Sequence, residues 1–231
     1  MEHHVLTEAT DPFCLDRAAA VALLTGAPWG RYAVLGDSLS AGTGDPTPGY
    51  GDQGWPERVA GILRSVRPDL AYLNVSEIGA TTAQALERQA DRVLAFSPDL
   101  LHLPCGANDI VRRTPDFDEI ERTLRRMYDL AKQTGALLTT FTLGRAYVVP
   151  VFPDWPERIA RVNTIVRGLA AEYDALVVDM WDHPVNDRDN LLSADRIHFS
   201  TSGQAVMASE MVEKLAKSLG RNTSELSSAA R

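Results

Sequence analysis

Five short apolar runs alternate with longer amphipathic segments along the chain. The runs are 32–35, 71–75, 100–103, 137–141 and 176–178. Runs that are apolar almost throughout are typical of strands in a sheet covered on both faces. Because these runs alternate with helical patterns, the sequence predicts right-handed βαβ units and a parallel, doubly wound α/β sheet.

Amphipathic segments follow the second to fifth runs. Apolar residues recur at helical spacing in the segment after Thr81, in 116–133, in 154–173 and in 203–219. Thr81 with Gln84 forms a capping-box pattern, and Gly220 is expected just beyond the last helix. We therefore predict a helix in each of the four segments.

No internal repeat, low-complexity tract or linker divides the 231 residues. The alternation of strand and helix occupies residues 30–219, so we expect one α/β domain there. Residues 1–29 are expected to form an N-terminal extension, and residues 220–231 a flexible C-terminal tail. A chain of this length buries roughly 70% of its unfolded surface, so its core needs neither a disulfide nor a metal.

The composition is acidic, because 23 Lys and Arg stand against 31 Asp and Glu, a formal net charge of −8. Nucleic acids and anionic membranes require a basic surface, so neither is an expected partner. No apolar run approaches the roughly 18 residues of a membrane span, and the run 18–25 lacks the positive lead of a signal peptide. Cys14 and Cys105 are too few for a disulfide framework. We expect a cytoplasmic protein, and the oligomeric state is left open.

Small and polar residues stand where the predicted strands end. The segments are 36–40 after the first strand, 79–82 after the second, 106–109 after the third and 195–198 before the last helix. In doubly wound sheets, ligands bind outside the carboxyl ends of the strands. We therefore expect these four segments to converge at one edge of the sheet.

Together these segments contain the groups that acyl transfer requires. Ser38 is a poor nucleophile unless a base takes its proton, and His198 is the candidate base. Asp195, three residues before the histidine, is placed to hold the imidazole in one tautomer. The amides of Ser38 and Gly79 and the side chain of Asn108 are candidate donors to the oxyanion. A Gly-Asp-Ser turn, a helix-entry glycine and a capping asparagine are each commonplace alone, but their order after successive strands predicts a catalytic set.

These blocks resemble the SGNH (GDSL) hydrolase family. The matching blocks, in order, are Gly36-Asp37-Ser38-Leu39, Gly79, Gly106-Ala107-Asn108-Asp109 and Asp195 to His198. The resemblance implies a flavodoxin-like three-layer α/β/α sandwich with five parallel strands. It also implies Ser38 as nucleophile, with His198 as base and Asp195 as its partner. The oxyanion hole would be formed by Ser38, Gly79 and Asn108.

The chain departs from the family's pattern at Ser40, where threonine is frequent, and at Phe199, where proline is frequent. No metal or cofactor is expected, because the five histidines are scattered without an HExxH pair and no glycine-rich nucleotide motif follows the first strand. The acidic segment 186–190 lacks the glycine and closing glutamate of a calcium loop. Cys105 is interpreted as a small buried filler.

Two stretches are candidates for the walls of a substrate pocket. Residues 42–54 contain Tyr50 and lead to Trp55, and residues 143–155 contain Tyr147 and Phe152. An apolar loop at the edge of the site suits an acyl or alcohol pocket. The alternative, a lid packed on the last helices, has equal weight.

Three functions are compatible with these residues. The leading hypothesis is a serine esterase that hydrolyses a small or medium O-acyl ester through an acyl-enzyme on Ser38. An acyltransferase would use the same residues to pass the acyl group to an alcohol or amine. A non-catalytic binding module is the least favoured, because the complete catalytic set argues against it.

Overall fold

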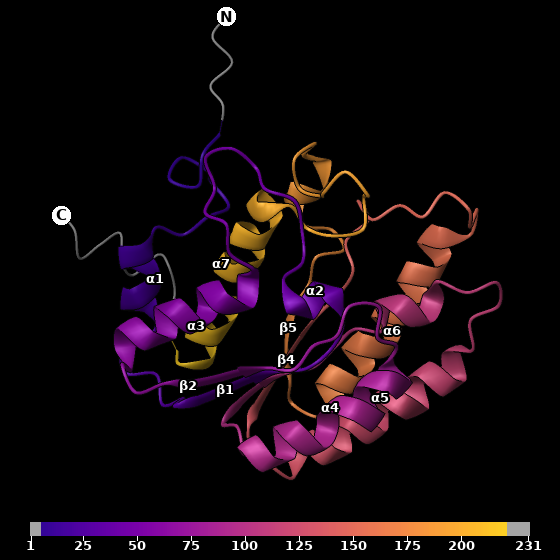
Figure 1. Ribbon diagram of the computed structural model, residues 1–231, viewed down its shortest axis with the longest axis horizontal. Helices are drawn as coiled ribbons and strands as arrows, with labels where there is room; N and C mark the ends of the chain where they lie inside the picture. Colours follow the sequence, from indigo (N-terminus) through magenta and orange to yellow (C-terminus); the bar gives the residue numbers. More distant parts are fainter. Residues whose placement is uncertain (1–5, 221–231) are drawn as a thin grey trace, which may run out of the picture.

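The five apolar runs form one parallel sheet in the computed structural model, which describes residues 6–220 (Figure 1). The strands are β1 Arg31–Val34, β2 Ala71–Asn74, β3 Leu100–His102, β4 Leu137–Phe141 and β5 Leu176–Val178. Their order across the sheet is β2-β1-β3-β4-β5, and every neighbouring pair is parallel. The predicted flavodoxin-like, doubly wound fold is confirmed.

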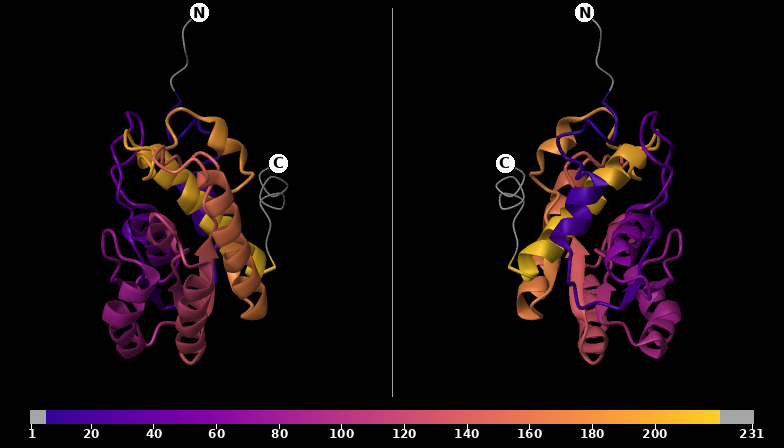
Figure 2. Two further views of the ribbon diagram at one scale, coloured as in Figure 1. Left: turned by 90° about the vertical axis from the view of Figure 1, so that its right-hand side faces the viewer. Right: turned by 90° about the vertical axis from the view of Figure 1, so that its left-hand side faces the viewer.

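Helices cover both faces of the sheet (Figures 1 and 2). One layer contains α1 (Arg17–Leu23), α3 (Trp55–Val66) and α7 (Thr201–Ser218), which pack against one another. The opposite layer contains α4 (Thr82–Phe96), α5 (Phe117–Lys132) and α6 (Trp155–Glu172). The short helix α2 (Ser38–Ala41) and the 3₁₀ helices η1 (Ala107–Ile110) and η2 (Pro184–Asp187) lie in the loops after β1, β3 and β5.

Capping residues set the starts of the predicted helices. Thr81 and Gln84 form the predicted capping box at the start of α4. Helix α7 begins at Thr201, two residues before the predicted start. The cause is Ser200, whose side chain accepts a hydrogen bond from the amide of Gly203 and so starts the helix at Thr201.

Helices α1 and α3 fall in segments where the pattern predicts none. They have 7 and 12 residues, so each offers few repeats of an apolar face. The start of α1 is marked by Asp16, whose side chain accepts a hydrogen bond from the amide of Ala19. Helix α3 has Pro56 in its first turn and buries Trp55 and Leu63.

Residues 6–29, within the expected N-terminal extension, contribute to the same hydrophobic core as the sheet. Leu23, Leu24 and Trp29 are buried in it. Of the expected C-terminal tail, residues 221–231 lie outside the described residues. No helix formed by residues 6–220 is long and apolar enough to span a bilayer.

A buried ion pair fastens this N-terminal segment to the loop after β5. Arg188 Nη1 donates to the two carboxylate oxygens of Asp11 at 2.7 and 3.0 Å, and the Tyr50 hydroxyl donates to Asp11 at 2.8 Å. Burial raises the pKa of Asp11, but hydrogen bonds from the amide of Phe13, from Arg188 and from Tyr50 outweigh it and hold the pKa below its usual value. The carboxylate is therefore ionised inside the protein and needs its cation.

Replacing Asp11 with alanine should lower the free energy of unfolding by about 3–5 kcal/mol, because Arg188 is then left largely buried without its counterion. Urea unfolding followed by circular dichroism measures the change. The control is Glu119→Ala, which breaks an exposed pair with Arg122 and should have almost no effect. Equal losses in the two variants would contradict a special role for the buried pair.

Candidate active site

The first strand ends in a sharp turn that presents Ser38 at the edge of the sheet. Gly36 has a φ of +147°, and a Cβ there would lie 2.4 Å from the Ser40 hydroxyl, so only glycine fits. Asp37 caps α2 by accepting a hydrogen bond from the amide of Leu39 at 3.0 Å. Ser38 is the first residue of this helix and is only 5% exposed.

Gln89 of α4 fixes this turn from behind. Its Oε1 accepts a hydrogen bond from the amide of Gly36 at 2.8 Å, and its Nε2 donates to the carbonyl of Gly36 at 2.8 Å. The two bonds satisfy a stretch of backbone that has left the sheet. Sequence reasoning missed Gln89. The available signal was a glutamine on the face of α4 that also buries Ala85 and Val93.

Ser38, His198 and Asp195 form a continuous hydrogen-bonded line, as expected. His198 Nε2 lies 2.8 Å from Ser38 Oγ, and His198 Nδ1 lies 2.6 Å from Asp195 Oδ2. Partial burial raises the pKa of Asp195, but hydrogen bonds from the His198 ring and from the amides of His198 and Ile197 outweigh this and hold the pKa below its usual value. The carboxylate is thus charged near neutral pH and orients the ring so that Nε2 faces the serine.

The loop that carries His198 is tied to the segment that follows Ser38. The amide of Asp45 donates to Ser193 Oγ at 2.8 Å, and the amide of Ala194 donates to the Asp45 carboxylate at 2.9 Å. These bonds join two loops that are about 150 residues apart in the chain, with sequence separations of 148 and 149. They hold His198 beside Ser38.

Asn108 lies in η1 and directs its carboxamide at the nucleophile turn. Its Nδ2 donates to the carbonyl of Ala80 at 3.0 Å and to Asp37 Oδ2 at 3.3 Å. Gly79 precedes Ala80, has a φ of +78°, and has open space where a Cβ would lie. Within residues 6–220, the amides of Ser38 and Gly79 donate to no protein acceptor. Asn108 therefore contacts the segments that contain the other two candidate oxyanion donors.

Comparison with known proteins identifies the family. A family model described as the GDSL-like lipase/acylhydrolase family matches residues 34–206. The chain belongs to this family. A curated arylesterase from Vibrio mimicus is 26% identical over 208 residues, which cover 90% of this chain and 95% of the relative.

Solved structures share the fold of this GDSL-like hydrolase. A psychrotrophic esterase, EstA from Pseudoalteromonas sp., has a TM-score of 0.66 and 20% identity, and the match covers 83% of this chain and 100% of that one. A variant of an acetyl xylan esterase from Geobacillus stearothermophilus has a TM-score of 0.66 and 23% identity, with 83% and 95% covered. The family and the arylesterase relative make this chain an ester hydrolase.

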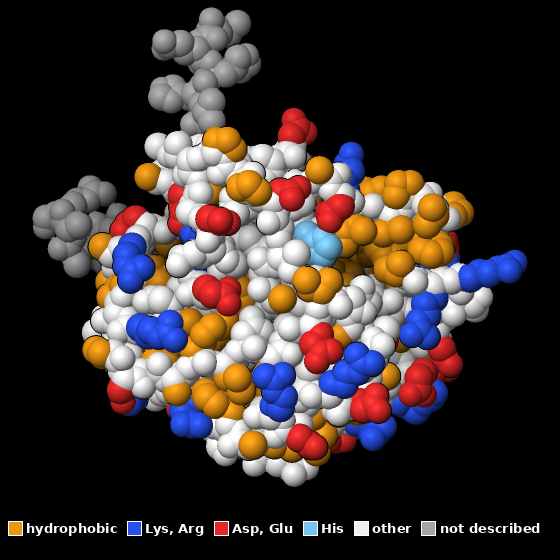
Figure 3. Space-filling view, viewed as in Figure 1, with side chains coloured by type: hydrophobic (Ala, Val, Ile, Leu, Met, Phe, Trp, Pro, Cys, Tyr) orange, Lys and Arg blue, Asp and Glu red, His pale blue; other side chains and the backbone are white. Residues whose placement is uncertain are grey.

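A small apolar pocket of about 30 Å³ opens beside Ser38 in the GDSL-like hydrolase. Its apolar lining includes Leu39, Val111, Leu143, Tyr147, Val149 and Trp155. Figure 3 shows apolar side chains gathered on this face of the molecule, over α6 and the loops beside it. Of the four side chains expected to line a substrate pocket, the structure places Tyr147 here.

The structure does not bring the other three expected side chains to this pocket. Tyr50 is bound to the N-terminal ion pair. Trp55 begins α3 and is fully buried, with its Nε1 donating to the carbonyl of Leu39 at 2.9 Å, so it supports α2 rather than lining the site. Phe152 stacks on Trp155 with ring centroids 6.1 Å apart and does not line the pocket.

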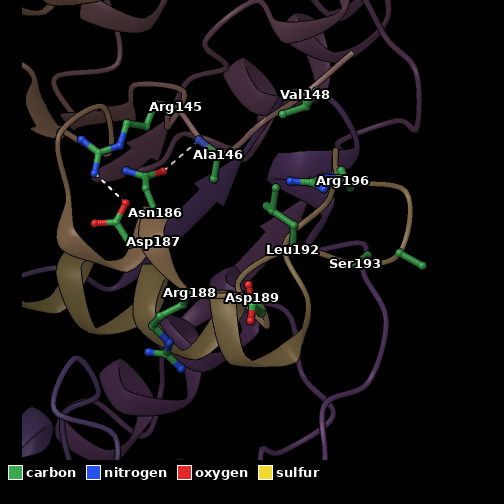
Figure 4. A pocket seen from close by; sticks show the side chains of 11 residues that line it. Arg145, Ala146, Val148, Asn186, Asp187, Arg188, Asp189, Leu192, Ser193 and Arg196 are labelled. Carbon is green, nitrogen blue, oxygen red and sulfur yellow. Dashed lines mark hydrogen bonds and ion pairs between the residues drawn. The ribbon is translucent and has the colours of Figure 1, made fainter. Parts of the chain in front are cut away.

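A larger polar hollow of about 410 Å³ adjoins the segment that carries the candidate histidine (Figure 4). Arg145 and Arg196 are among its lining residues. Arg145 donates to Asp187 at 2.8 Å, and Asn186 accepts a hydrogen bond from the amide of Ala146 at 3.2 Å. These bonds brace the loop after β4 against the loop after β5.

Among residues 6–220, neither a cluster of metal-ligating side chains nor a readily ionised thiol lies at this edge. Within residues 6–220, no group of three or more His, Cys, Asp or Glu side chains is arranged to hold a metal ion. Cys105 is buried, and burial raises the pKa of its thiol well above the usual value. A thiol that stays protonated is a poor nucleophile, which leaves Ser38 as the candidate.

Asp37 is the electrostatically costly residue of the site in this GDSL-like hydrolase. It is only 3% exposed. Burial, together with the negative charge of Asp109, raises the pKa of Asp37 to about 6, although the amides of Leu39 and Ser40 donate hydrogen bonds to it. The folded protein therefore holds this carboxylate at a free-energy cost near neutral pH.

The raised pKa predicts how Asp37→Asn changes stability with pH. The folded state binds the proton more tightly than the unfolded state, so the stability due to this group is full below about pH 3.8 and is lost as the pH rises through about 6. The variant should therefore raise the free energy of unfolding at pH 7.5 by on the order of 3 kcal/mol and change it little below pH 4. Urea unfolding at both pH values measures this. An equal gain at both would contradict the charge as the cause.

Proposed function

We propose that this GDSL-like hydrolase is a serine esterase that hydrolyses a small or medium O-acyl ester through an acyl-enzyme on Ser38. The observation that carries the proposal is the line from Ser38 Oγ through His198 to Asp195, with distances of 2.8 and 2.6 Å. A hydroxyl, a base and an orienting carboxylate in this arrangement are the elements of nucleophilic acyl transfer.

In the first step, Ser38 Oγ attacks the ester carbonyl carbon while His198 Nε2 takes its proton. The carbonyl electron pair moves to the oxygen, whose negative charge is bound by the amides of Ser38 and Gly79 and by Asn108 Nδ2. Asp195 stabilises the imidazolium. The imidazolium then gives its proton to the alcohol oxygen as the bond between carbon and alcohol breaks, which leaves the acyl group on the serine.

In the second step, water takes the place of the alcohol. His198 removes a proton from the water as its oxygen attacks the acyl carbon, and the same donors bind the second oxyanion. When this intermediate collapses, Ser38 Oγ leaves and recovers a proton from His198. The acid is released, and the enzyme returns to its starting state.

The exposed rim around the pocket favours an ester with an apolar alcohol, which would lie outside the small cavity. Val111 and Ile197 line the pocket and are 44% and 38% exposed. Large apolar side chains that remain exposed in this way commonly mark a binding surface. The relative named an arylesterase agrees with this chemistry. Phenyl esters such as p-nitrophenyl acetate are therefore the proposed assay substrates.

Ser38→Ala and His198→Ala should each abolish cleavage of p-nitrophenyl acetate, and the double variant should be no worse than either single one. The reason is that residues of a triad act as a unit, so removing the second member removes little more. Steady-state rates measure the loss, and circular dichroism checks that each variant is folded. Normal turnover in folded Ser38→Ala would contradict the proposal.

The acyl-enzyme itself is tested by trapping. An aryl phosphonate should add one phosphonyl group to the wild-type protein and none to Ser38→Ala, as read from intact mass. The turnover assay is also run with and without an added alcohol, because an acyltransferase would release product faster when an acceptor is present. A rate that is unchanged by the acceptor supports hydrolysis.

Asn108→Ala should lower kcat by roughly 10²–10³ with little change in KM. Its carboxamide would bind charge that exists only in the transition state, and the 3.3 Å bond to Asp37 is the weaker of its two present contacts. Initial rates over a range of substrate concentrations separate the two constants. A raised KM with unchanged kcat would instead make Asn108 a ground-state binding residue.

A further inference from the structure

The apolar pocket beside Ser38 has two walls from different parts of the chain. Val111, just after η1, belongs to one wall, while Val149 and Trp155, from the loop after β4 and the start of α6, belong to the other. The cavity of about 30 Å³ is about two to three times the space that one water molecule needs on the same measure. Such a cavity accommodates only a few carbon atoms.

Arg158 joins these two walls. Its side chain is 7% exposed, which is unusual for a cation. Its guanidinium donates to the carbonyls of Ile110 at 3.0 Å, of Arg113 at 3.3 Å and of Arg112. Its Nε donates to Asp154 at 2.9 Å. One side chain of α6 thus binds three backbone carbonyls at the end of η1 and just after it, together with Asp154 at the start of its own helix.

The position of Arg158 fixes the width of the pocket. Val111 lies between two of the carbonyls that Arg158 binds, and Trp155 lies one turn before Arg158 on the same helix. The distance between the two walls is therefore set by a hydrogen-bonded cation rather than by apolar contacts that slide easily.

Aromatic packing supports the wall that contains Val149 and Trp155. Trp155 Nε1 donates to the carbonyl of Tyr147 at 3.1 Å, and the Tyr147 ring packs edge-on against Phe199 with centroids 5.6 Å apart. Phe152 stacks behind Trp155, and the guanidinium of Arg158 lies 4.2 Å from the centre of the Phe152 ring. A longer acyl chain would have to displace this whole set.

We propose that Arg158 is a positioning residue that locks the two walls together and so restricts this hydrolase to short acyl groups of about two to four carbons. This inference rests on the proposed esterase function. The limit applies to the length of the acyl group of the ester, and Arg158 is the residue that sets it.

The first measurement is kcat/KM of the wild-type enzyme for p-nitrophenyl acetate, butyrate, hexanoate and octanoate. We expect the values to fall at least about tenfold from butyrate to octanoate, because even one methylene that does not fit costs roughly a factor of ten. The ratio of octanoate to butyrate is independent of the fraction of folded enzyme. A merely structural change therefore does not move it.

Val149→Ala should raise the ratio of octanoate to butyrate by about tenfold, because it removes two carbons from the wall. The matched control is Val151→Ala, the same change two residues further along the loop at a side chain that is 76% exposed and outside the pocket. The control should keep the wild-type ratio. Equal ratios in the two variants would overturn the assignment of this wall.

Arg158→Met keeps an unbranched apolar side chain but removes the guanidinium and its hydrogen bonds, and should also raise the ratio of octanoate to butyrate. Arg161→Met, on the same helix at a side chain that is 61% exposed, should leave it unchanged. If Arg158→Met does not fold, Arg158→Lys supplies the test, because lysine keeps the charge but lacks the planar guanidinium whose three nitrogens reach the carbonyls and Asp154 from separate positions. A wild-type ratio in the folded Arg158 variant would overturn the role proposed for Arg158.

The outcomes separate this inference from the proposed function. A wild-type enzyme that cleaves octanoate as efficiently as butyrate would remain an esterase, but the limit on acyl length would be wrong. A wild-type enzyme that cleaves none of the four esters above the Ser38→Ala background would instead contradict the proposed function itself.

Discussion

The turn at Gly36 is the constraint on which the rest of the site depends. β1 ends at Val34, and the chain enters a helix only four residues later, at Ser38. Such an abrupt change needs a positive φ at a point where a Cβ would meet the Ser40 side chain, so glycine is required. Asp37 is buried as a consequence, and its raised pKa shows the stability that the protein gives up for this geometry.

Topology brings some of the other groups to that turn, but not all of them. The strand order reverses between β1 and β3, so Ser38 and Asn108, which follow those strands, flank the switch point. His198 follows β5 at the far edge of the sheet, and topology alone does not deliver it. The hydrogen bond from the amide of Asp45 to Ser193 joins the loop of His198 to the segment after Ser38. The alignment of Ser38, His198 and Asp195 therefore depends on residues that are not among these three.

Features set by the order of strands and helices could be predicted from the sequence, whereas features set by contacts between distant side chains could not. The five strands and the closeness of Ser38 to His198 could be predicted from local patterns, because Ser38 stands just after a strand and His198 just before a helix. Trp55 is also close to Ser38 in sequence, yet it begins a helix that turns its indole beneath α2. Arg158 and Gln89 occupy helical patterns where charged and polar side chains ordinarily face water. Only the packing of η1 and the first strand's turn against those helices buries them.

Two helices use buried carboxamides to fix the backbone at the edge of the sheet where Ser38 lies. Gln89 binds both the amide and the carbonyl of Gly36, and Asn163 of α6 does the same for Leu143 after β4, with both bonds at 2.8 Å. Backbone that leaves a sheet needs new partners for its amide and its carbonyl, and a carboxamide offers both a donor and an acceptor without a buried charge. A carboxylate can only accept and a lysine can only donate. Helices α4 and α6 therefore shape this site as directly as the loops that would touch the substrate.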